Sequence, residues 1–263
     1  MVLDTIGYWN TAPGAGGAAA AAAAGDSLTI RNARQGTKVL LLDALSCNQA
    51  AGFQQVICPN GNDTTRDKRW VVPATQPRAY WGANVAERLQ PQDMIAATIA
   101  GSAVAGDIEQ GALVVWYEDL PGISAHLIDS AELKSRFVRL VTVAQTIAAG
   151  AGGGWTGAAA INATTDLLRA NRDYAVLGIV TRILCSAVGL RSPDWGNLRV
   201  CVPGNPTDQE HTQGWFWRMS DRFNLPLIPV FNSANRGNTF LDCMQDENAV
   251  AVIMSVILAE LSS

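Results

Sequence analysis

The sequence predicts an all-β protein, mainly strands with short helices in loops, arranged as two tandem β-sandwiches. Apolar runs rich in β-branched and aromatic residues recur along the 263 residues and are separated by turn signals. Strands do not alternate with long amphipathic helices, which argues against a doubly wound α/β fold. One pattern also occurs twice: a strand-like run, a turn of small residues, an acidic patch and a closing apolar run. The closing runs are Gly111–Leu120 (GALVVWYEDL) and Ala249–Leu261 (AVAVIMSVILAEL).

Residues 1–25 are predicted to form a flexible N-terminal arm rich in alanine and glycine. Tyr8 and Trp9 precede Ala12–Gly25 (APGAGGAAAAAAAG), which has no polar face and no amphipathic period. An aromatic tip on a tether of small residues suits contact with a neighbouring subunit. A disordered tail is the alternative that the sequence leaves open.

The first sandwich is predicted to span residues 26–122. Its strand candidates either alternate between apolar and polar residues or form short buried runs bounded by turns. Residues 73–92 contain three prolines and are predicted to form a long surface loop. The strand candidates are Ser27–Asn32, Lys38–Leu45, Gly52–Pro59, the end of Asp63–Pro73, Met94–Ala100 and Ala112–Tyr117.

A linker over residues 123–136 and a second sandwich over residues 137–263 complete the prediction. Ala125–Phe137 has the apolar spacing of a short helix. Leu225–Phe231 holds two prolines, which favours an edge strand or an extended segment. The other strand candidates are Phe137–Ala149, Tyr174–Leu190 and Leu198–Pro203, and short helices are predicted within Asn162–Tyr174 and at Trp215–Phe223. This strand count fits two sandwiches of Greek-key or jelly-roll type.

The composition favours a protein whose surface is covered by partners. Hydrophobic residues make up 48% of the chain and charged residues only 16%, with a formal net charge of −4. An acidic chain lacks the basic face of a general nucleic-acid or anionic-membrane binder. No apolar run reaches the roughly 18–20 residues that span a bilayer. The start MVLDTIGYWN lacks the features of a signal peptide, so we expect synthesis in the cytoplasm of the cell that makes the protein.

No residue pattern predicts a catalytic, cofactor or metal site, so we expect a protein that is not an enzyme. The five cysteines form no CxxC motif and are expected to be buried free thiols. The two histidines, His126 and His211, stand in no metal-binding motif. Arg66–Trp70 mixes basic and aromatic residues, as a nucleic-acid contact does, but an ordinary strand edge or a salt-bridge patch fits it better.

Acidic residues and tryptophans leave two interpretations open. Acids at the strand ends could serve a glycan-processing enzyme, or they could be solvated turn residues. The acids concerned are Glu118, Asp119, Asp242, Asp246 and Glu247. The eight tryptophans could stack on sugars or anchor interfaces, and the low charge favours interfaces. The candidate intersubunit contacts are Tyr8, Trp9, Trp70, Trp81, Trp155, Trp215 and Trp217.

In layout, from Asp26 to Leu261, the chain resembles the double jelly-roll major capsid proteins of tail-less icosahedral viruses and phages. The resemblance implies two sandwiches side by side, trimers that look hexagonal, and an arm, here Met1–Gly25, that ties subunits together or faces the particle interior. It also implies a virion protein made in the host cytoplasm, whose partners are its own copies and other virion proteins, with no cofactor. A carbohydrate-binding or glycan-processing β-sandwich is the alternative, and a cytosolic scaffold or filament subunit is a third.

Overall fold

The computed structural model describes most of the chain, and all structural statements below refer to that part. The described residues are 1–11, 21–22, 24–34, 36–48, 50–58, 68–74, 78–79, 86–100, 104, 106–148, 153–161, 167–182, 185–204, 212–245 and 251–262.

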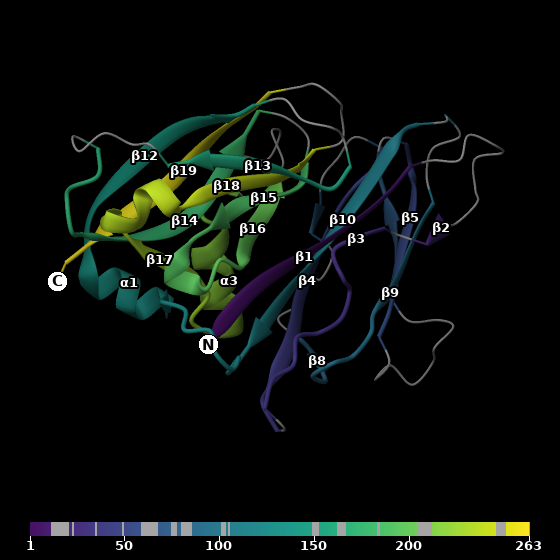
Figure 1. The fold of residues 1–263 in the computed structure, drawn as a ribbon, viewed down its shortest axis with the longest axis horizontal. Coiled ribbons are helices and arrows are strands. Elements are labelled where there is room, and N and C mark those ends of the chain that lie inside the picture. Colours follow the sequence, from purple (N-terminus) through teal and green to yellow (C-terminus); the bar gives the residue numbers. More distant parts are fainter. Residues whose placement is uncertain are drawn as a thin grey trace.

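The fold is all-β, as predicted, and consists of four antiparallel sheets with a few short helices (Figure 1). The first half of the chain forms two of these sheets. Sheet 1A contains β3 (Ala24–Gly25), β1 (Val2–Thr11), β10 (Ile108–Tyr117), β4 (Val39–Cys47) and β7 (Arg78–Ala79) in that order, and β8 (Glu87–Leu89) also pairs with β4. Sheet 1B contains β2 (Ala21–Ala22), β9 (Ala96–Ala100), β5 (Gly52–Ile57) and β6 (Lys68–Val72).

The second half forms the other two sheets and contains the helices α1 (Ser130–Arg136) and α3 (Trp215–Phe223). Sheet 2A contains β11 (Leu127–Ile128), β17 (Ile228–Asn232), β14 (Asp173–Thr181), β19 (Val252–Leu261) and β12 (Phe137–Ile147) in that order. Sheet 2B contains β13 (Trp155–Ala160), β18 (Phe240–Gln245), β15 (Cys185–Arg191) and β16 (Arg199–Gly204). Single turns of 3₁₀-helix lie at Pro193–Trp195 and Ser233–Asn238.

The two halves have the same topology. Sheet 1A contains the order β1-β10-β4-β8 and sheet 2A contains β12-β19-β14-β17. When the two-residue strands β3, β7 and β11 are left out of the count, this is in each half the order first, eighth, third, sixth. Sheets 1B and 2B both run second, seventh, fourth, fifth. Eight strands in these two orders form a double-sheet jelly roll. The repeat predicted from the closing apolar runs is confirmed, because those runs form β10 and β19, which occupy the same place in each jelly roll.

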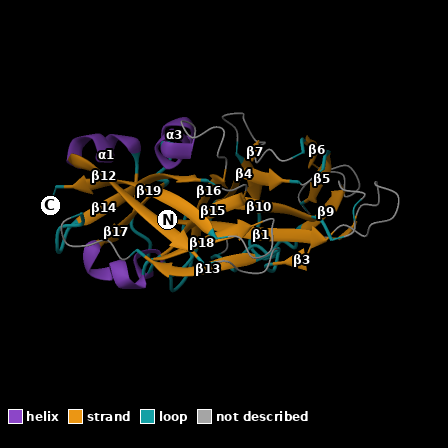
Figure 2. Ribbon diagram, turned by 90° about the horizontal axis from the view of Figure 1, so that it is seen from above, coloured by secondary structure: helices purple, strands orange, loops and turns teal. Residues whose placement is uncertain are grey.

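The four sheets are stacked in the order 1B, 1A, 2B, 2A, and the two central sheets are covered on both faces (Figures 1 and 2). Every residue of β4 and β10 is buried. This double burial explains why both strands are almost continuously apolar rather than alternating. The buried residues of the two halves form one hydrophobic cluster, so the jelly rolls share a core across their junction.

Helices α1 and α3 form where the sequence predicts them, whereas the described residues of the helix predicted within Asn162–Tyr174 form turns and the start of β14. Asp129 caps α1 by accepting a 2.7 Å hydrogen bond from the backbone N–H of Glu132. The chain then passes directly from α1 into β12 at Phe137. Helix α3 buries its apolar face and ends at Asn224, which adopts the left-handed conformation with φ 51°.

The prediction of a flexible arm over residues 1–25 is wrong for residues 2–11, 21–22 and 24–25, which form β1, β2 and β3. Val2–Thr11 is the buried strand β1, which pairs with β10 from Val2↔Tyr117 to Thr11↔Ile108. The reason is that β1 lies between two packed layers. Its even-numbered residues face sheet 1B, since Tyr8 reaches Gln54 there, and its odd-numbered residues face sheet 2B, since Thr5 reaches Cys201. Residues 12–20 of the predicted arm lie outside the described part.

Three smaller predictions also change. Tyr174–Leu190 forms two strands in different sheets, β14 and β15, and only β15 makes the expected antiparallel pair with β16. Strand β17 lies between β14 and the two-residue β11, so it is not at the sheet edge, and Pro229 pairs with Leu127. The long loop over residues 73–92 contributes β7 and β8 to sheet 1A.

Candidate functional site

The outer face of sheet 2A is free of charged residues along its last two strands. Leu140 of β12 lies beside Ala259 of β19, and the pairs Thr142↔Ile257, Ala144↔Ser255 and Thr146↔Ile253 follow on the same face. The alternate residues of both strands, among them Val141, Val143, Val256 and Leu258, are buried and point toward sheet 2B. Leu140 is 60% exposed and Ile253 is 43% exposed. This arrangement leaves a broad uncharged surface of small and aliphatic side chains.

The outer face of sheet 1B is similar. Gln54 of β5 points inward and accepts a 2.8 Å hydrogen bond from the Tyr8 hydroxyl, so its neighbours Phe53 and Gln55 point outward. Phe53 pairs with Val71 of β6, which is 71% exposed. The charged side chain here is Arg69, whose guanidinium carbon lies 3.5 Å from the centre of the Phe53 ring. Arg69 therefore lies over an aromatic face.

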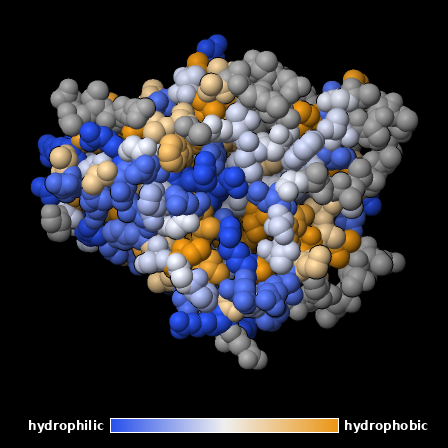
Figure 3. Space-filling view, in the orientation of Figure 1, coloured by the Kyte–Doolittle hydropathy of each residue, from blue (hydrophilic) through white to orange (hydrophobic). Residues whose placement is uncertain are grey.

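Charged and polar side chains are plentiful elsewhere on the surface. Figure 3 shows a face on which hydrophilic residues cover much of the second half of the chain. The scarcity of charge on the two outer sheet faces is therefore a local property. A flat sheet face without charge loses little solvation when another protein surface covers it.

An apolar hollow of about 330 Å³ lies beside the outer face of sheet 2A. Leu133 and Lys134 of α1, Phe137, Leu177 of β14, and Gly214 and Trp217 at α3 line it. The segment before α3 crosses β14 closely, because a Cβ atom at Gly178 would lie 1.9 Å from the carbonyl oxygen of Thr212. Glycine at this position therefore allows α3 to be held against the sheet. Trp217 is 37% exposed, and the Lys134 ammonium lies 5.8 Å from the centre of its ring.

The junction between sheets 1A and 2B combines tight packing with buried polar contacts. The Thr5 hydroxyl oxygen accepts a 3.2 Å hydrogen bond from the backbone N–H of Cys201, and the Ser186 hydroxyl donates one of 3.1 Å to the side chain of Gln110. A Cβ atom at Gly7 would lie 2.4 Å from the Met244 sulfur. The two jelly rolls are therefore fixed face to face by specific contacts.

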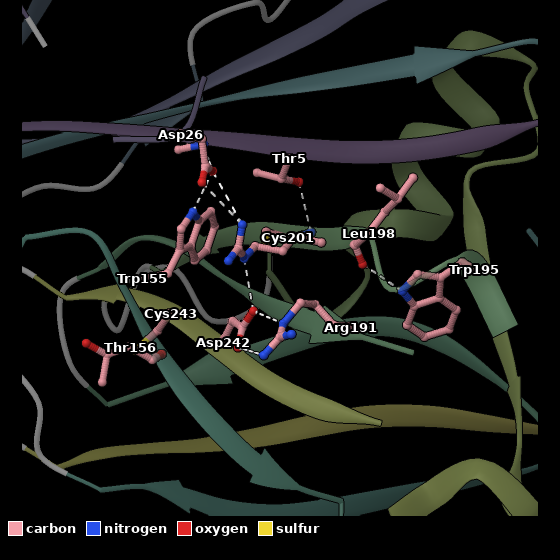
Figure 4. A network of polar contacts seen from close by, with 12 residues as sticks. Thr5, Asp26, Trp155, Thr156, Arg191, Trp195, Leu198, Cys201, Asp242 and Cys243 are labelled. Carbon is pink, nitrogen blue, oxygen red and sulfur yellow. Dashed lines mark hydrogen bonds and ion pairs between the residues drawn. The ribbon is translucent and has the colours of Figure 1, made fainter. Parts of the chain in front are cut away.

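A network of charged groups closes one end of this junction (Figure 4). Asp26 of the first half accepts a 2.7 Å hydrogen bond from Nε1 of Trp155 and a 2.9 Å bond from the backbone N–H of Gly7. Arg199 lies 3.4 Å from the Asp26 carboxylate, 3.0 Å from that of Asp242, and 4.5 Å from the centre of the Trp155 ring. Asp242 is also bound by Arg191. The network joins both halves and neutralises its own charges.

A polar cavity of about 210 Å³ lies next to this network. It is lined by Asp4, Thr5, Ile6, Asp26, Ser27, Thr29, Arg31 and Arg199. Burial raises the pKa of the Asp4 carboxyl, and the Arg31 guanidinium, 2.7 Å away, opposes that rise only in part. The acids and arginines that line the cavity pair with one another, as Asp4 does with Arg31 and Asp26 with Arg199. Their charges therefore stabilise the fold rather than offer a binding site for an ion.

A second ionic cluster surrounds Glu260 in the second jelly roll. Glu260 has a 2% exposed side chain, 2.6 Å from Arg139 and 3.2 Å from Arg169. Burial by itself would raise the pKa of Glu260, but the hydrogen bond from Arg139 and the charge of Arg169 outweigh it, and the pKa is lowered. The ionised form of Glu260 is thus part of the folded structure.

The structure contradicts two of the predicted intersubunit contacts. Tyr8 is completely buried and Trp215 is 3% exposed, because each packs into the core of its own chain. Trp9, Trp70 and Trp155 are partly buried against the same core, and Trp70 Nε1 donates a 3.1 Å hydrogen bond to Ser46. Trp217 is the most exposed of the described candidates, and Trp81 lies outside the described residues.

The three predicted acids that the structure describes, Glu118, Asp119 and Asp242, have different partners. Asp242 is held by two arginines, whereas the Glu118 carboxylate accepts a 3.1 Å bond from the backbone N–H of Lys38 and Asp119 lies 3.5 Å from Arg34. Asp246, Glu247 and His211 lie outside the described residues. The basic run near Trp70 is used within the chain, since Lys68 pairs with Glu87 and Arg69 covers Phe53.

Further properties of the described part bear on possible sites. All five cysteines are buried and free, and burial raises the pKa of the Cys201 thiol. Within the described ranges, no three His, Cys, Asp or Glu side chains gather in a way that could hold a metal ion. A helix long and apolar enough to cross a membrane is also absent from those ranges.

Sequence reasoning did not single out the residues of the two outer faces. Alternation along Leu140–Thr146 indicates a strand, but only the order of the sheets decides which of its faces stays open. Neither a protein-family model nor a curated protein matches this chain.

Proposed function

We propose that this chain is a structural virion protein, a capsid subunit that assembles with copies of itself into an icosahedral shell. The observation that carries the proposal is the pair of jelly rolls of the same topology, packed face to face, with a sheet face that carries little charge among its described residues at each end of the stack. The sequence-level resemblance to double jelly-roll capsid proteins supports the same function.

The junction within the chain suggests how copies associate. Inside the molecule, sheet 1A of the first jelly roll packs on sheet 2B of the second. The open sheets are 2A, which corresponds to 1A, and 1B, which corresponds to 2B. A second copy that repeats the internal junction would place its sheet 1B on sheet 2A of the first copy. This contact is head-to-tail. It closes into a ring when a whole number of rotations from one copy to the next makes a full turn.

Residues 2–11 of the predicted arm are not proposed to tie subunits together, because they form β1, which is buried in the core of its own chain. Subunits therefore associate through sheet faces. We propose the virion as the location, after synthesis in the host cytoplasm, and other virion proteins as further partners.

The mass of the purified protein tests the proposal. Size-exclusion chromatography with light scattering should give rings, of which a trimer has six jelly rolls, or larger shells, and negative-stain microscopy of the same fraction should show them. A monomer of 27.9 kDa at every concentration would overturn the proposal.

A carbohydrate-binding protein is the second candidate, and one observation favours it. Trp217 presents a partly exposed indole beside the apolar hollow between α1 and α3, and a sugar ring can stack on such a surface. A glycan array read with the wild type and with Trp217→Ala tests this candidate. Binding by a monomer that the substitution abolishes would favour it over the shell.

A further inference from the structure

Strand β12 forms an open edge of sheet 2A. It is the last strand in that sheet, and no described strand pairs with its other side. In the first jelly roll, the equivalent strand β1 is flanked by β3, through the pairs Tyr8↔Gly25 and Trp9↔Ala24. One jelly roll therefore covers part of this edge with its own chain, and the described part of the other leaves it open. Figure 1 shows β12 along the border of the second half.

Strand β12 carries few of the features that keep edges apart: a register shift between Phe137 and Arg139, and the charge of Arg139, which is bound to the buried Glu260. Phe137–Ile147 is 11 residues long and contains no proline and no lysine. Its single charged residue is Arg139, whose guanidinium is held by Glu260 at 2.6 Å. Val138 and Leu140 are 46% and 60% exposed. An edge with these properties is a template for pairing with another strand.

We propose that β12 pairs with β12 of a second copy, antiparallel, about a two-fold axis at Thr142. This register pairs the whole strand, from Phe137 to Ile147 of the other copy. It places Arg139 opposite Gln145 and Leu140 opposite Ala144, so no like charges meet. The two copies contribute the same surface, as a two-fold contact requires. The outer faces of the two sheets then form one continuous surface.

This contact differs from the sheet-on-face contact that builds a ring. The edge contact extends the proposed capsid function, because a two-fold contact would join one ring to the next. Its biological role therefore rests on the proposed function. The edge pairing itself depends only on β12 and can be tested separately.

Three cysteine variants test the register. Directly opposed side chains in an antiparallel pair have Cβ atoms about 4.5–5.5 Å apart, close enough for a disulfide after small adjustments. Thr142→Cys should therefore link to itself when oxidised glutathione accepts the electrons of the two thiols. Leu140→Cys alone and Ala144→Cys alone should stay monomeric on a non-reducing gel, whereas a mixture of the two should link. The native cysteines are buried, so the wild type is the blank.

The outcomes separate this proposal from the proposed function. Rings without any Thr142→Cys link would overturn the edge pairing and leave the shell function standing. A Thr142→Cys link in a protein that otherwise forms no rings would support the edge pairing and count against the shell. Thr142→Lys places two like charges opposite each other at the axis and should lower edge-mediated dimerisation by at least tenfold in sedimentation equilibrium. Thr146→Lys faces Val138 of the other copy, and its effect should be smaller; equal effects would contradict the register.

Discussion

Asp26 and Trp155, which lie on different jelly rolls, are joined by a 2.7 Å hydrogen bond from the indole Nε1 to the carboxylate. The same carboxylate accepts the backbone N–H of Gly7 and lies beside Arg199. One side chain thus holds the middle of β1 and two residues of sheet 2B together.

Asp26→Ala should lower the free energy of unfolding by about 1–3 kcal/mol, because it leaves the partly buried donors of Trp155 and Gly7 without their acceptor. Urea unfolding followed by tryptophan fluorescence measures the change. Ser27→Ala is the control, since the Ser27 hydroxyl makes an exposed bond to Thr29. Similar losses in both variants would contradict the role of Asp26.

Glu260→Gln should lower the free energy of unfolding at pH 7 by about 1.5–3 kcal/mol, the value of hydrogen bonds to charged groups. The pKa of Glu260 is lowered from its ordinary value of 4.5. Its contribution to stability is therefore present above about pH 4.5 and is lost as the pH falls through the lowered value. Urea unfolding from pH 3 to 7 should show the two proteins converging in acid. A difference that is constant with pH would argue against the ion pairs.

The effect of Asp4→Asn on the free energy of unfolding should depend on pH in the opposite direction to that of Glu260→Gln. The pKa of Asp4 is raised above its ordinary value of 3.8, so the neutral carboxyl is favoured in the folded protein. The stability that Asp4 contributes is fully present below pH 3.8 and is lost as the pH rises through the raised value. The asparagine variant has no such titration. The free energy of unfolding of Asp4→Asn, measured relative to that of the wild type in the same urea series, should therefore increase as the pH rises.

Substitutions on the outer faces should break the head-to-tail contact. Ile253→Lys on sheet 2A and Val71→Lys on sheet 1B, where Arg69 is already close by, each place an unpaired charge in the proposed interface, at a cost of about 2 kcal/mol or more, which is about 30-fold in affinity. Light scattering over a concentration series measures the loss. Ala234→Lys, at an exposed position in the 3₁₀ turn, is the control for added charge.

Pairs of face substitutions sharpen this test. The variant that combines Val71→Glu with Ile253→Lys carries opposite charges on the two faces and should associate better than the one that combines Val71→Lys with Ile253→Lys. Equal association of the two double variants would mean that these faces do not meet.

The sequence was sufficient to predict the fold class, helices α1 and α3, and the internal repeat. These features depend on local pattern, such as the cap at Asp129 and the apolar closing runs that became β10 and β19. The first strand was missed for a physical reason. Val2–Thr11 is buried on both sides against different sheets, so Asp4, Thr5 and Tyr8 face partners that are distant in sequence. These polar residues interrupt the apolar pattern by which a buried strand is recognised in a sequence.

The outer faces and the open edge could not be predicted at all. Leu140, Thr142 and Ala144 alternate with buried valines as any half-exposed strand does. Which face meets solvent follows from the stacking of four sheets, and which strand lies at an edge follows from the sheet order. Both are products of long-range pairing. Aromatic residues misled the prediction at Tyr8 and Trp215, because core packing and interfaces favour the same side chains.

The position of β1 also sets the order in which the protein can fold. Its pairing partner β10 begins at Ile108, and the layer that covers its other face includes β16, which begins at Arg199. Strand β1 therefore leaves the ribosome well before the strands that pair with it and cover it. Contacts between segments so far apart form slowly, and until they form, the open side of sheet 1A is exposed to other nascent chains. A finished subunit therefore requires nearly the whole chain, at least as far as β16.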